Sequence, residues 1–297
     1  MKVFVTGATG FISSEIVREL LGAGHQVLGL TRSDAGAQAL QAAGAAVHRG
    51  NLEDLDSLRA GAQQADAVIH TAFDHDFSNF VSNCEKDKRA IEALGTSLVG
   101  SQRPLIITSG VGMGSAGPGQ PAIETHVDLS HPNPRVASEL AGSSLSARGL
   151  DVRVVRLPQV HNTLKQGLIT YLIALAREQR ISAYAGEGLN RWSAVHVRAA
   201  AHLYRLVLER GTAGRRYHAV AETGVTFRAI AETIGQGLKI PVVSLPAEKV
   251  GPHFGWLQMF AGLDLSASSE LTRQWLDWEP TGPSLLTDLE QMRYDAA

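Results

Sequence analysis

A glycine-rich turn follows the first apolar run of this 297-residue chain. Residues 3–5 are apolar, as in a buried strand, and between residues 11 and 21 apolar side chains recur at helical spacing. Between the two segments, Gly7 permits a tight turn, and Gly10 lets the backbone approach a pyrophosphate with no Cβ in the way. The positive dipole end of the following helix favours the same anion. Strand, glycine turn and helix in this order predict a dinucleotide-binding unit.

The same alternation of short apolar runs and amphipathic segments continues through the first half of the chain. It predicts parallel βαβ units with helices on both faces, and therefore a doubly wound parallel sheet. Past residue 157 the alternation weakens, and helices are separated by loops rich in Gly and Pro. We expect an α/β fold with a dinucleotide-binding domain and a smaller, mainly helical C-terminal substrate lobe. The domain is expected at residues 1–160, completed around 193–220, and the lobe at 161–192 and 221–297.

Individual elements follow from the periodicity. The expected strands are residues 3–5, 26–30, 46–48, 67–69, 105–107 and 152–155, and the expected helices 11–21, 35–43, 54–60, 80–98, 133–147, 164–178, 197–209 and 227–238. The last helix of the first half is expected to begin with Asn133 as its N-cap and Pro134 in its first turn.

Composition excludes several classes of protein. With 44% apolar residues and a formal net charge of −2, the chain is neither disordered nor basic enough for nucleic acid or anionic lipid. No run approaches the roughly 18 apolar residues of a membrane span, and residues 3–5 are too short for a signal-peptide core. Cys84 is the single cysteine, so no intrachain disulfide forms. We expect a cytoplasmic protein that binds a small-molecule substrate and contacts neither membrane nor nucleic acid. The sequence is compatible with a homo-oligomer.

Six segments together resemble the short-chain dehydrogenase/reductases, in their extended or atypical, epimerase/dehydratase-like branch. These segments are residues 6–12, 51–52, 66–72, 107–110, 156–158 and 195–197. The resemblance implies a Rossmann sheet, with Asn51 and Leu52 flanking the adenine and residues 71–73 lining the cofactor cleft. Ser13 stands where the family usually has a third glycine, and serine is small enough for close helix–strand packing. The candidate cofactor-binding residues are Gly7, Thr9, Gly10, Phe11, Ile12, Arg32, Ser33, Asn51, Leu52, Thr71, Ala72, Phe73 and Leu157.

The residues after the second strand indicate whether the coenzyme is NAD(H) or NADP(H). An NAD site needs a carboxylate there to hold the ribose 2′-hydroxyl, but this chain has Thr31, Arg32 and Ser33. Arg32 and Ser33 offer donors for a 2′-phosphate, and Asp34 lies past the turn. A solvated surface arginine is the alternative interpretation. The sequence favours NADP(H).

The family's catalytic pair is absent. Its members usually carry Tyr-x-x-x-Lys plus a Ser or Thr, and the lysine lowers the tyrosine pKa for proton transfer. Ser109 matches the family serine, but the Tyr and Lys positions fall on Arg135 and Glu139. Arginine does not deprotonate in proteins, so it cannot be the acid/base. Either Arg135 and Glu139 form an i,i+4 ion pair, or Arg135 donates hydrogen bonds to a substrate carbonyl or carboxylate.

The proton must then come from another group. Candidates are a cluster of two acids and a histidine after the fourth strand, which could titrate near neutrality, and three residues beyond it. They are Asp74, His75, Asp76, His161, Tyr171 and Tyr184. Arg191 and Trp192 lie in a segment that resembles a family loop closing over the substrate. The alternative interpretation is that Trp192 belongs to the core between the two lobes. No metal-ligand spacing stands out.

The function that fits these residues is an NADPH-dependent oxidoreductase that transfers hydride to a small carbonyl compound, with an atypical active site. A non-catalytic NADP(H)-sensing protein is one alternative. A nucleotide-sugar epimerase or dehydratase is the other, weakened by the missing Tyr and Lys. Fold resemblance alone does not decide among them.

Overall fold

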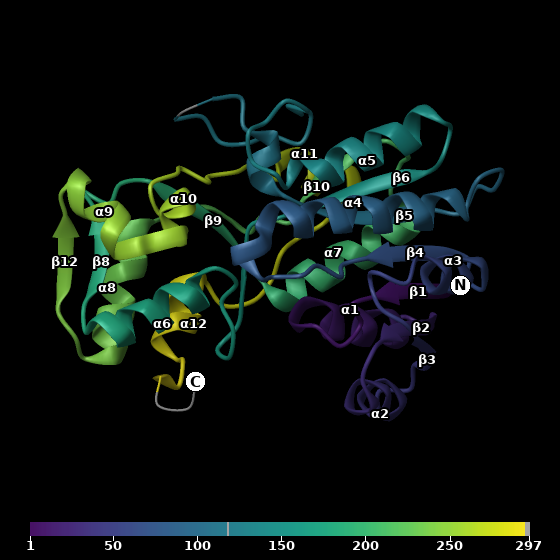
Figure 1. Cartoon of the computed structure of the whole chain (residues 1–297), viewed down its shortest axis with the longest axis horizontal. Helices are drawn as coiled ribbons and strands as arrows, with labels where there is room; N and C mark the ends of the chain where they lie inside the picture. Colours follow the sequence, from purple (N-terminus) through teal and green to yellow (C-terminus); the bar gives the residue numbers. More distant parts are fainter. Residues whose placement is uncertain (118, 295–297) are drawn as a thin grey trace.

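A seven-stranded parallel sheet forms the centre of the larger part of the molecule (Figure 1). The computed structural model describes residues 1–117 and 119–294. The strand order is β10-β6-β5-β4-β1-β2-β3, so the direction of winding reverses between β1 and β4. Ligands of such sheets bind beyond the carboxyl ends of the strands at this reversal. The strands are β1 Lys2–Thr6, β2 Gln26–Thr31, β3 Ala46–Arg49, β4 Ala67–His70, β5 Leu105–Gly110, β6 Val152–Leu157 and β10 Arg216–His218.

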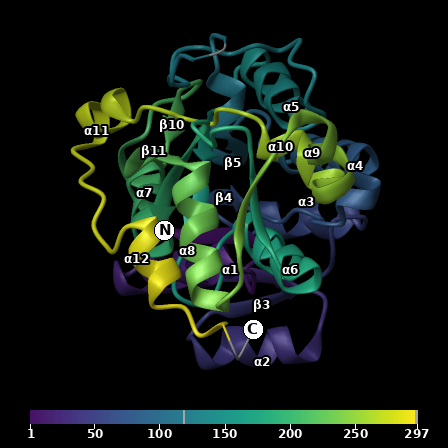
Figure 2. The same cartoon turned by 90° about the vertical axis from the view of Figure 1, so that its left-hand side faces the viewer.

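Helices cover both faces of this sheet, which confirms the predicted doubly wound α/β fold. Side chains of a strand alternate between faces, and Val3 and Val5 pack with α1 and α7 while Phe4 packs with α3 and α4. The two views of Figures 1 and 2 show the layers. The helices are α1 Phe11–Gly22, α2 Asp34–Ala42, α3 Leu55–Gln63, α4 Phe80–Thr96, α5 Val136–Ala147 and α7 Val197–Arg210.

A second hydrophobic core lies in the C-terminal lobe, on the left of Figure 1. It is built around Trp192, Phe227 and Phe254. Two small sheets support it, β11-β9-β7 and the parallel pair β12-β8. None of the helices in the described part of the chain is long and apolar enough to cross a membrane. The remaining elements are β7 Gln159–His161, α6 Ile169–Gln179, β8 Ser182–Ala185, β9 Arg191–His196, β11 Glu222–Thr226, α8 Phe227–Leu238, β12 Val242–Leu245, α9 Ala247–Phe254, α10 Gln258–Ala261, α11 Glu270–Leu276 and α12 Leu285–Glu290, with short 3₁₀ turns η1 Phe77–Asn79, η2 Val111–Gly114 and η3 Gly255–Leu257.

Two predicted helices begin later than expected. Helix α5 begins at Val136 because the Asn133 side chain accepts the N–H of Arg135 (2.9 Å) and holds a turn before the helix. Helix α6 begins at Ile169 because the Asn162 side chain accepts two N–H groups, those of Leu164 and Lys165, in a turn of its own. The prediction that Asn133 caps the helix is therefore wrong.

A buried carboxylate joins α5 to the edge of the sheet. Glu139 accepts hydrogen bonds from Arg156 on β6 (2.7 Å) and from Arg216 on β10 (2.8 Å), and neither Glu139 nor Arg156 is exposed. Burial raises the pKa of Glu139, but the two guanidinium groups outweigh it and hold the pKa below its usual value. Both carboxylate oxygens are occupied.

Glu139→Ala is expected to lower the free energy of unfolding by about 3–5 kcal/mol, because it leaves the buried Arg156 charge uncompensated. Urea unfolding at neutral pH measures the loss. As a control, Glu232→Ala removes an exposed i,i+4 pair with Arg228 and should cost far less. Equal losses in the two variants would show that the buried triad does not hold this edge.

Candidate functional site

The β1–α1 turn has the shape of a phosphate cradle. Gly7 has φ +64°, and a Cβ on it would lie 2.8 Å from the Cα of Ala72, so no other residue fits without a shift of backbone. Gly10 donates its N–H to the Gly7 carbonyl (2.8 Å) and begins α1 with no side-chain cap. The first N–H groups of α1 are thus left for an anion. This turn fits the pyrophosphate of a dinucleotide.

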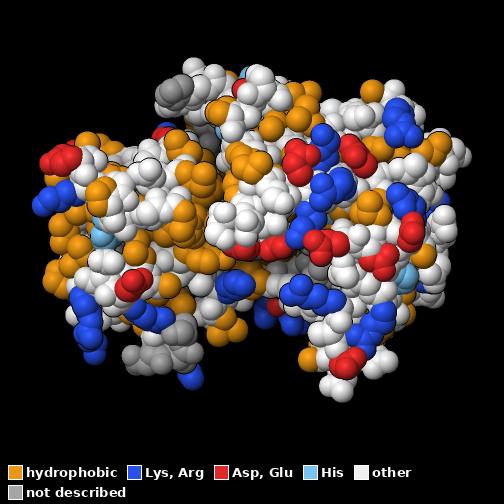
Figure 3. Space-filling model, viewed as in Figure 1, with side chains coloured by type: hydrophobic (Ala, Val, Ile, Leu, Met, Phe, Trp, Pro, Cys, Tyr) orange, Lys and Arg blue, Asp and Glu red, His pale blue; other side chains and the backbone are white. Residues whose placement is uncertain are grey.

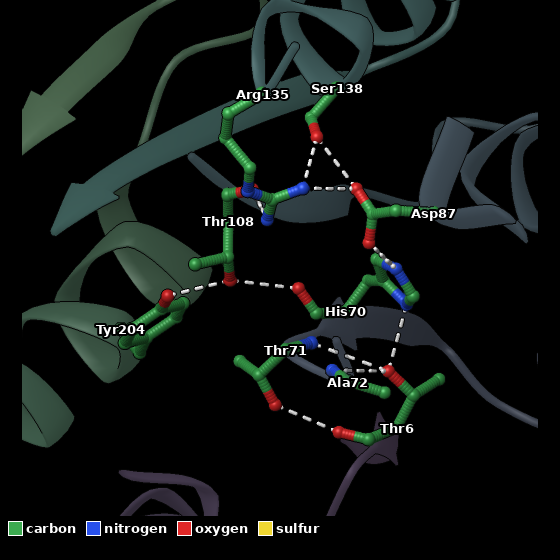
Figure 4. A network of polar contacts seen from close by, with 9 residues as sticks. All are labelled: Thr6, His70, Thr71, Ala72, Asp87, Thr108, Arg135, Ser138 and Tyr204. Carbon is green, nitrogen blue, oxygen red and sulfur yellow. Dashed lines mark hydrogen bonds and ion pairs between the residues drawn. The ribbon is translucent and has the colours of Figure 1, made fainter. Parts of the chain in front are cut away.

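Hydroxyl groups fix the end of β4 against this turn (Figure 4). The Thr6 Oγ1 accepts the N–H groups of Thr71 (3.2 Å) and Ala72 (3.3 Å), and the Thr71 hydroxyl donates to the Thr6 carbonyl (2.8 Å). The Ser13 hydroxyl is then the donor in its 2.6 Å hydrogen bond to Thr71 Oγ1. Serine at the third-glycine position therefore both packs closely and ties α1 to β4.

The carboxyl ends of β2 and β3 carry the residues expected at the ribose. Ser33 caps α2 by accepting the N–H of Gly36 (3.0 Å), which leaves its hydroxyl proton free to donate. Asp34 pairs with Arg49 at the end of β3. Arg32 is exposed, and nothing in the described part of the chain pairs with it. The acid that could compete with a 2′-phosphate thus has Arg49 as its own partner, in an exposed ion pair that the sequence analysis did not single out.

The other candidate cofactor residues lie at the same edge of the sheet, because parallel strands place their carboxyl ends together. Asn51 turns the chain by accepting the N–H groups of Glu53 (2.8 Å) and Asp54 (3.1 Å). Leu157 ends β6 and is partly buried against the main core. Thr9 is exposed in the glycine turn, Phe11 and Ile12 open α1, Leu52 is partly buried after β3, and Phe73 follows β4.

Ser109 lies near the end of β5, where the resemblance places the family serine. It is 3% exposed, and its Oγ has no hydrogen-bond partner among the described residues. A buried hydroxyl without a partner is costly unless a bound group satisfies it. Ser109 therefore fits a role as donor to a bound molecule.

Arg135, which the resemblance places at the tyrosine position, lies immediately before α5 (Figure 4). Its Nη1 donates to Asp87 Oδ2 (2.6 Å) and to the Ser138 hydroxyl, and its Nη2 donates to the Thr108 carbonyl (3.0 Å). The guanidinium also lies over the Phe73 ring, 4.2 Å from its centroid. Nε–H and one Nη2–H have no acceptor within the described residues, and the side chain is 16% exposed.

The i,i+4 ion pair between Arg135 and Glu139 is not formed. Arg135 takes its carboxylate from Asp87 on α4, and Glu139 takes its cations from Arg156 and Arg216. Glu139 at the lysine position is therefore held inside the structure, away from reacting groups, and we retain only Ser109 and Arg135 as candidates for contact with substrate.

Asp87 connects Arg135 to the glycine turn through His70. Asp87 is 1% exposed and its Oδ1 lies 3.0 Å from His70 Nε2, while His70 Nδ1 lies 2.8 Å from Thr6 Oγ1. Since Thr6 Oγ1 already accepts two N–H groups, we assign its proton to Nδ1 and the imidazole proton to Nε2, which donates to Asp87. Burial raises the pKa of Asp87, but the charge of Arg135 and the hydrogen bonds outweigh it and hold the pKa well below its usual value.

A buried tyrosine also contacts this network. The Thr108 hydroxyl donates to the His70 carbonyl (2.8 Å), so Tyr204 of α7 donates to Thr108 Oγ1 (2.7 Å). Burial raises the pKa of Tyr204, and it remains a neutral donor. The sequence analysis missed Asp87, His70 and Tyr204. One signal was present: Asp87 shares the buried face of α4 with Cys84, an unusual place for an acid.

The acids of the expected proton-donor cluster have local partners. Asp74 pairs with Lys86 (3.0 Å), and Asp76 accepts the N–H of Ser78 (3.0 Å) to cap η1. The His75 ring contacts Phe73 edge-on, at 5.2 Å between ring centroids. His75 is exposed at the surface, yet desolvation by the packed rings around it, followed by the charge of Arg135, lowers its pKa. His75 therefore favours the neutral form near the site.

The three more distant candidates are separated from one another. His161 is buried and hydrogen-bonded to Asp288 of α12 (2.6 Å). Tyr171 of α6 contacts aromatic rings beside the β4 loop, and Tyr184 of β8 lies under Arg228 of the lobe. Of the expected pocket residues, Arg191 pairs with Asp264, and the next residue, the tryptophan, is fully buried in the lobe core. The described residues contain no group of three His, Cys, Asp or Glu that could hold a metal ion.

Asp87→Asn removes the charge that faces Arg135 and should lower the free energy of unfolding by about 3 kcal/mol at pH 7. Since the folded-state pKa is depressed, the stabilisation is complete above the unfolded-state pKa of about 3.9 and is lost as pH falls below it. The difference between the variant and the parent protein should therefore shrink below about pH 4.

Urea unfolding at a series of pH values measures that difference. Asp56→Asn is the control, because Asp56 is almost fully exposed and its pair with Arg59 should contribute no more than about 0.5 kcal/mol. A difference for Asp87→Asn that stays constant down to acid pH would contradict the assigned charge of Asp87.

Comparisons with known proteins agree with this geometry. The pattern that defines the NAD dependent epimerase/dehydratase family matches residues 3–220. An uncharacterized protein of Schizosaccharomyces pombe is 46% identical, covering 99% of this chain and 100% of its own length. A ketoreductase of Stigmatella aurantiaca, acting on 4-hydroxy-2-methyl-3-oxo-4-farnesyl-3,4-dihydroquinoline-1-oxide, is 26% identical over 86% of this chain and 80% of its own.

Among solved structures, a dTDP-glucose 4,6-dehydratase from Streptomyces venezuelae with NAD bound has the same fold. Its TM-score is 0.76 at 20% identity, and the alignment covers 98% of this chain and 96% of the dehydratase. The resemblance inferred from the glycine turn and the strand ends is confirmed. The chain belongs to the NAD-dependent epimerase/dehydratase family, within the short-chain dehydrogenase/reductases.

Proposed function

We propose that this chain is a cytoplasmic NADPH-dependent oxidoreductase that transfers hydride to a small carbonyl compound, with an active site that lacks the family Tyr/Lys pair. The observation that carries the proposal is the anchoring of Arg135, which we align with the family tyrosine. Arg135 is held by Asp87 and bound to the carbonyl of Thr108, the residue next to Ser109. These contacts support a reacting centre with two donors of different kinds, the Ser109 hydroxyl and the Arg135 guanidinium.

Reduction suits these donors better than oxidation or epimerisation. When hydride adds to a carbonyl carbon, negative charge develops on the oxygen, and the Ser109 hydroxyl and the free N–H groups of Arg135 can stabilise it. A bound nicotinamide would supply the hydride. Arg135 cannot accept a proton, whereas removing one from an alcohol needs a base. The name of the Stigmatella relative, a ketoreductase, supports the same direction.

The coenzyme preference rests on Arg32. No acid takes the NAD-selective position after β2, Asp34 is paired with Arg49, and Ser33 retains a donor. A 2′-phosphate would find one unpaired guanidinium and one hydroxyl there. These contacts support NADPH over NADH as the coenzyme of this chain.

The first test compares NADPH with NADH in thermal unfolding. A ligand specific for the folded state stabilises it by about 2.7 kcal/mol at a hundredfold excess over its Kd. NADPH should raise Tm more than NADH, and Arg32→Ala should remove most of that difference. The matched control Arg59→Ala removes an exposed arginine whose one ion-pair partner among the described residues is Asp56, and it should leave the difference intact. Equal shifts with the two coenzymes would contradict the role of Arg32.

The second test follows NADPH consumption with a panel of aldehydes and ketones. Ser109→Ala and Arg135→Ala should each lower kcat by about 10²–10³, because each removes a donor to the developing alkoxide. KM should change less, because the contact strengthens in the transition state. Glu139→Lys, which would restore the family lysine, is not included. It would place a third cation between Arg156 and Arg216 and destabilise the fold.

Two results would overturn the proposal in different ways. If both alanine variants keep kcat/KM within about twofold, Ser109 and Arg135 are structural. If NADPH binds tightly and no carbonyl is turned over, the chain is better described as an NADP(H)-sensing protein. Turnover of a nucleotide sugar alone would instead support the epimerase or dehydratase alternative.

A further inference from the structure

Six aromatic side chains form a continuous cluster between the β4 loop and the C-terminal lobe. We name it the aromatic wall, and its members come from segments that are far apart in the sequence. They are Phe73, Phe77, Phe80, Tyr171, Trp256 and Phe260. The β4 loop and the start of α4 supply the first three, α6 the fourth, and η3 and α10 the last two.

The wall has a defined packing order. Phe77 stacks on Trp256 with ring centroids 4.4 Å apart and planes 11° from parallel. Tyr171 meets both rings edge-on, at 5.6 Å from Phe77 and 5.3 Å from Trp256. Aromatic pairs at such distances are attractive beyond their burial. The wall is therefore an ordered apolar surface that joins the two parts of the molecule.

One end of the wall is at the proposed reacting centre. Phe73 lies under the Arg135 guanidinium and is 6.3 Å from Phe80, which is 5.5 Å from Phe77. A molecule whose carbonyl oxygen contacts Arg135 thus has aromatic rings directly beside it. A chain of contacts thus runs from Arg135 through Phe73, Phe80 and Phe77 to Trp256 in the lobe.

The other end of the wall is open to solvent. Tyr171 is 37% exposed, Trp256 40% and Met259, next to it on α10, 45%. Figure 3 shows hydrophobic side chains gathered over the C-terminal lobe at the left, whereas most charged side chains on that face lie over the sheet domain. Large apolar side chains left exposed together mark a binding surface more often than isolated ones do.

Lys165, whose charge lowers the pKa of His75 beside the wall, has no ion-pair partner among the described residues, whereas the other two cations there are paired. Lys86 is paired with Asp74 and with Glu53 (3.4 Å), and Arg135 is paired with Asp87. Within the described residues, no cation lies over the Tyr171 or Trp256 rings. Phosphate groups are usually held by arginine or lysine donors. The outer part of the wall offers aromatic surface instead.

We propose that the substrate is a carbonyl compound with an aromatic or bulky apolar group, which packs against the open side of Trp256 and Tyr171, and not a nucleotide sugar. This inference rests on the proposed function. In the reaction the carbonyl carbon gains a hydride and its oxygen gains a proton from water, so the product is the alcohol and NADPH is oxidised to NADP⁺. Ring stacking orients the substrate, while Ser109 and Arg135 contact its oxygen.

The experiment separates binding from turnover in the full-length protein. Calorimetric titration of the protein saturated with NADP⁺ measures the Kd of 2-acetylnaphthalene and of UDP-glucose. NADPH consumption gives kcat/KM for 2-naphthaldehyde and for propionaldehyde. The variants are Trp256→Ala, Trp256→Phe, which keeps a ring, and Val242→Ala, which shortens an exposed side chain on β12 at the outer edge of the same lobe.

We expect 2-acetylnaphthalene to bind and UDP-glucose not to bind. Trp256→Ala should weaken that binding, and lower the naphthaldehyde-to-propionaldehyde ratio of kcat/KM, by about tenfold or more. Trp256→Phe should restore much of both, and Val242→Ala should change neither. Binding of 2-acetylnaphthalene without turnover of any carbonyl supports the apolar ligand and contradicts the proposed function.

Other results overturn the inference and leave the proposed function standing. One is turnover of propionaldehyde with no preference for the aromatic aldehyde and no binding of 2-acetylnaphthalene. Another is a ratio unchanged in Trp256→Ala. Tighter binding of UDP-glucose than of 2-acetylnaphthalene would also overturn it, in favour of a nucleotide-sugar ligand.

Discussion

The buried ion pair between Asp87 and Arg135 is the interaction on which the site depends. An isolated carboxylate or guanidinium at this depth would be strongly unfavourable, so each charge requires the other. Asp87 also accepts from Ser138 and from His70, which in turn reaches Thr6 under the glycine turn. The pair therefore joins α4, α5, β4 and β1, and it aligns the proposed reacting centre with the phosphate cradle.

Local signals in the sequence predicted the sheet and the position of the site. The glycine turn after residues 3–5, with Gly7 at positive φ, and the alternation of apolar runs identified the doubly wound fold. Arg32 was assigned from its place after the second strand, and Ser109 and Leu157 from the family resemblance, and all three lie at one edge because parallel strands end together there. Spacing along the chain was enough for the sheet, whereas the site residues also needed the family resemblance. The short strands β7 to β12 lack such periodicity and were largely missed.

Partners that come from distant segments could not be predicted in this way. The four-residue spacing of Arg135 and Glu139 allowed a local ion pair between them. In the structure each side chain pairs with residues from other elements of the fold. Asp87 lies 48 positions before Arg135, and Arg216 lies 77 positions after Glu139. Burial makes these pairs strong, and burial is a property of the assembled fold. The aromatic wall, too, is assembled only when the β4 loop meets η3.

A double-mutant cycle tests the central claim most directly: Asp87 acts in catalysis by holding Arg135. The measurement is kcat for carbonyl reduction with NADPH in the parent protein, Arg135→Ala, Asp87→Asn and the double variant, at a temperature where all four are folded. The account predicts non-additive losses, with the double variant within about twofold of Arg135→Ala, since Asp87 affects the chemical step through Arg135 and its contacts with Ser138 and His70 are structural. Losses that multiply in the double variant would contradict it, because Asp87 and Arg135 would then act independently.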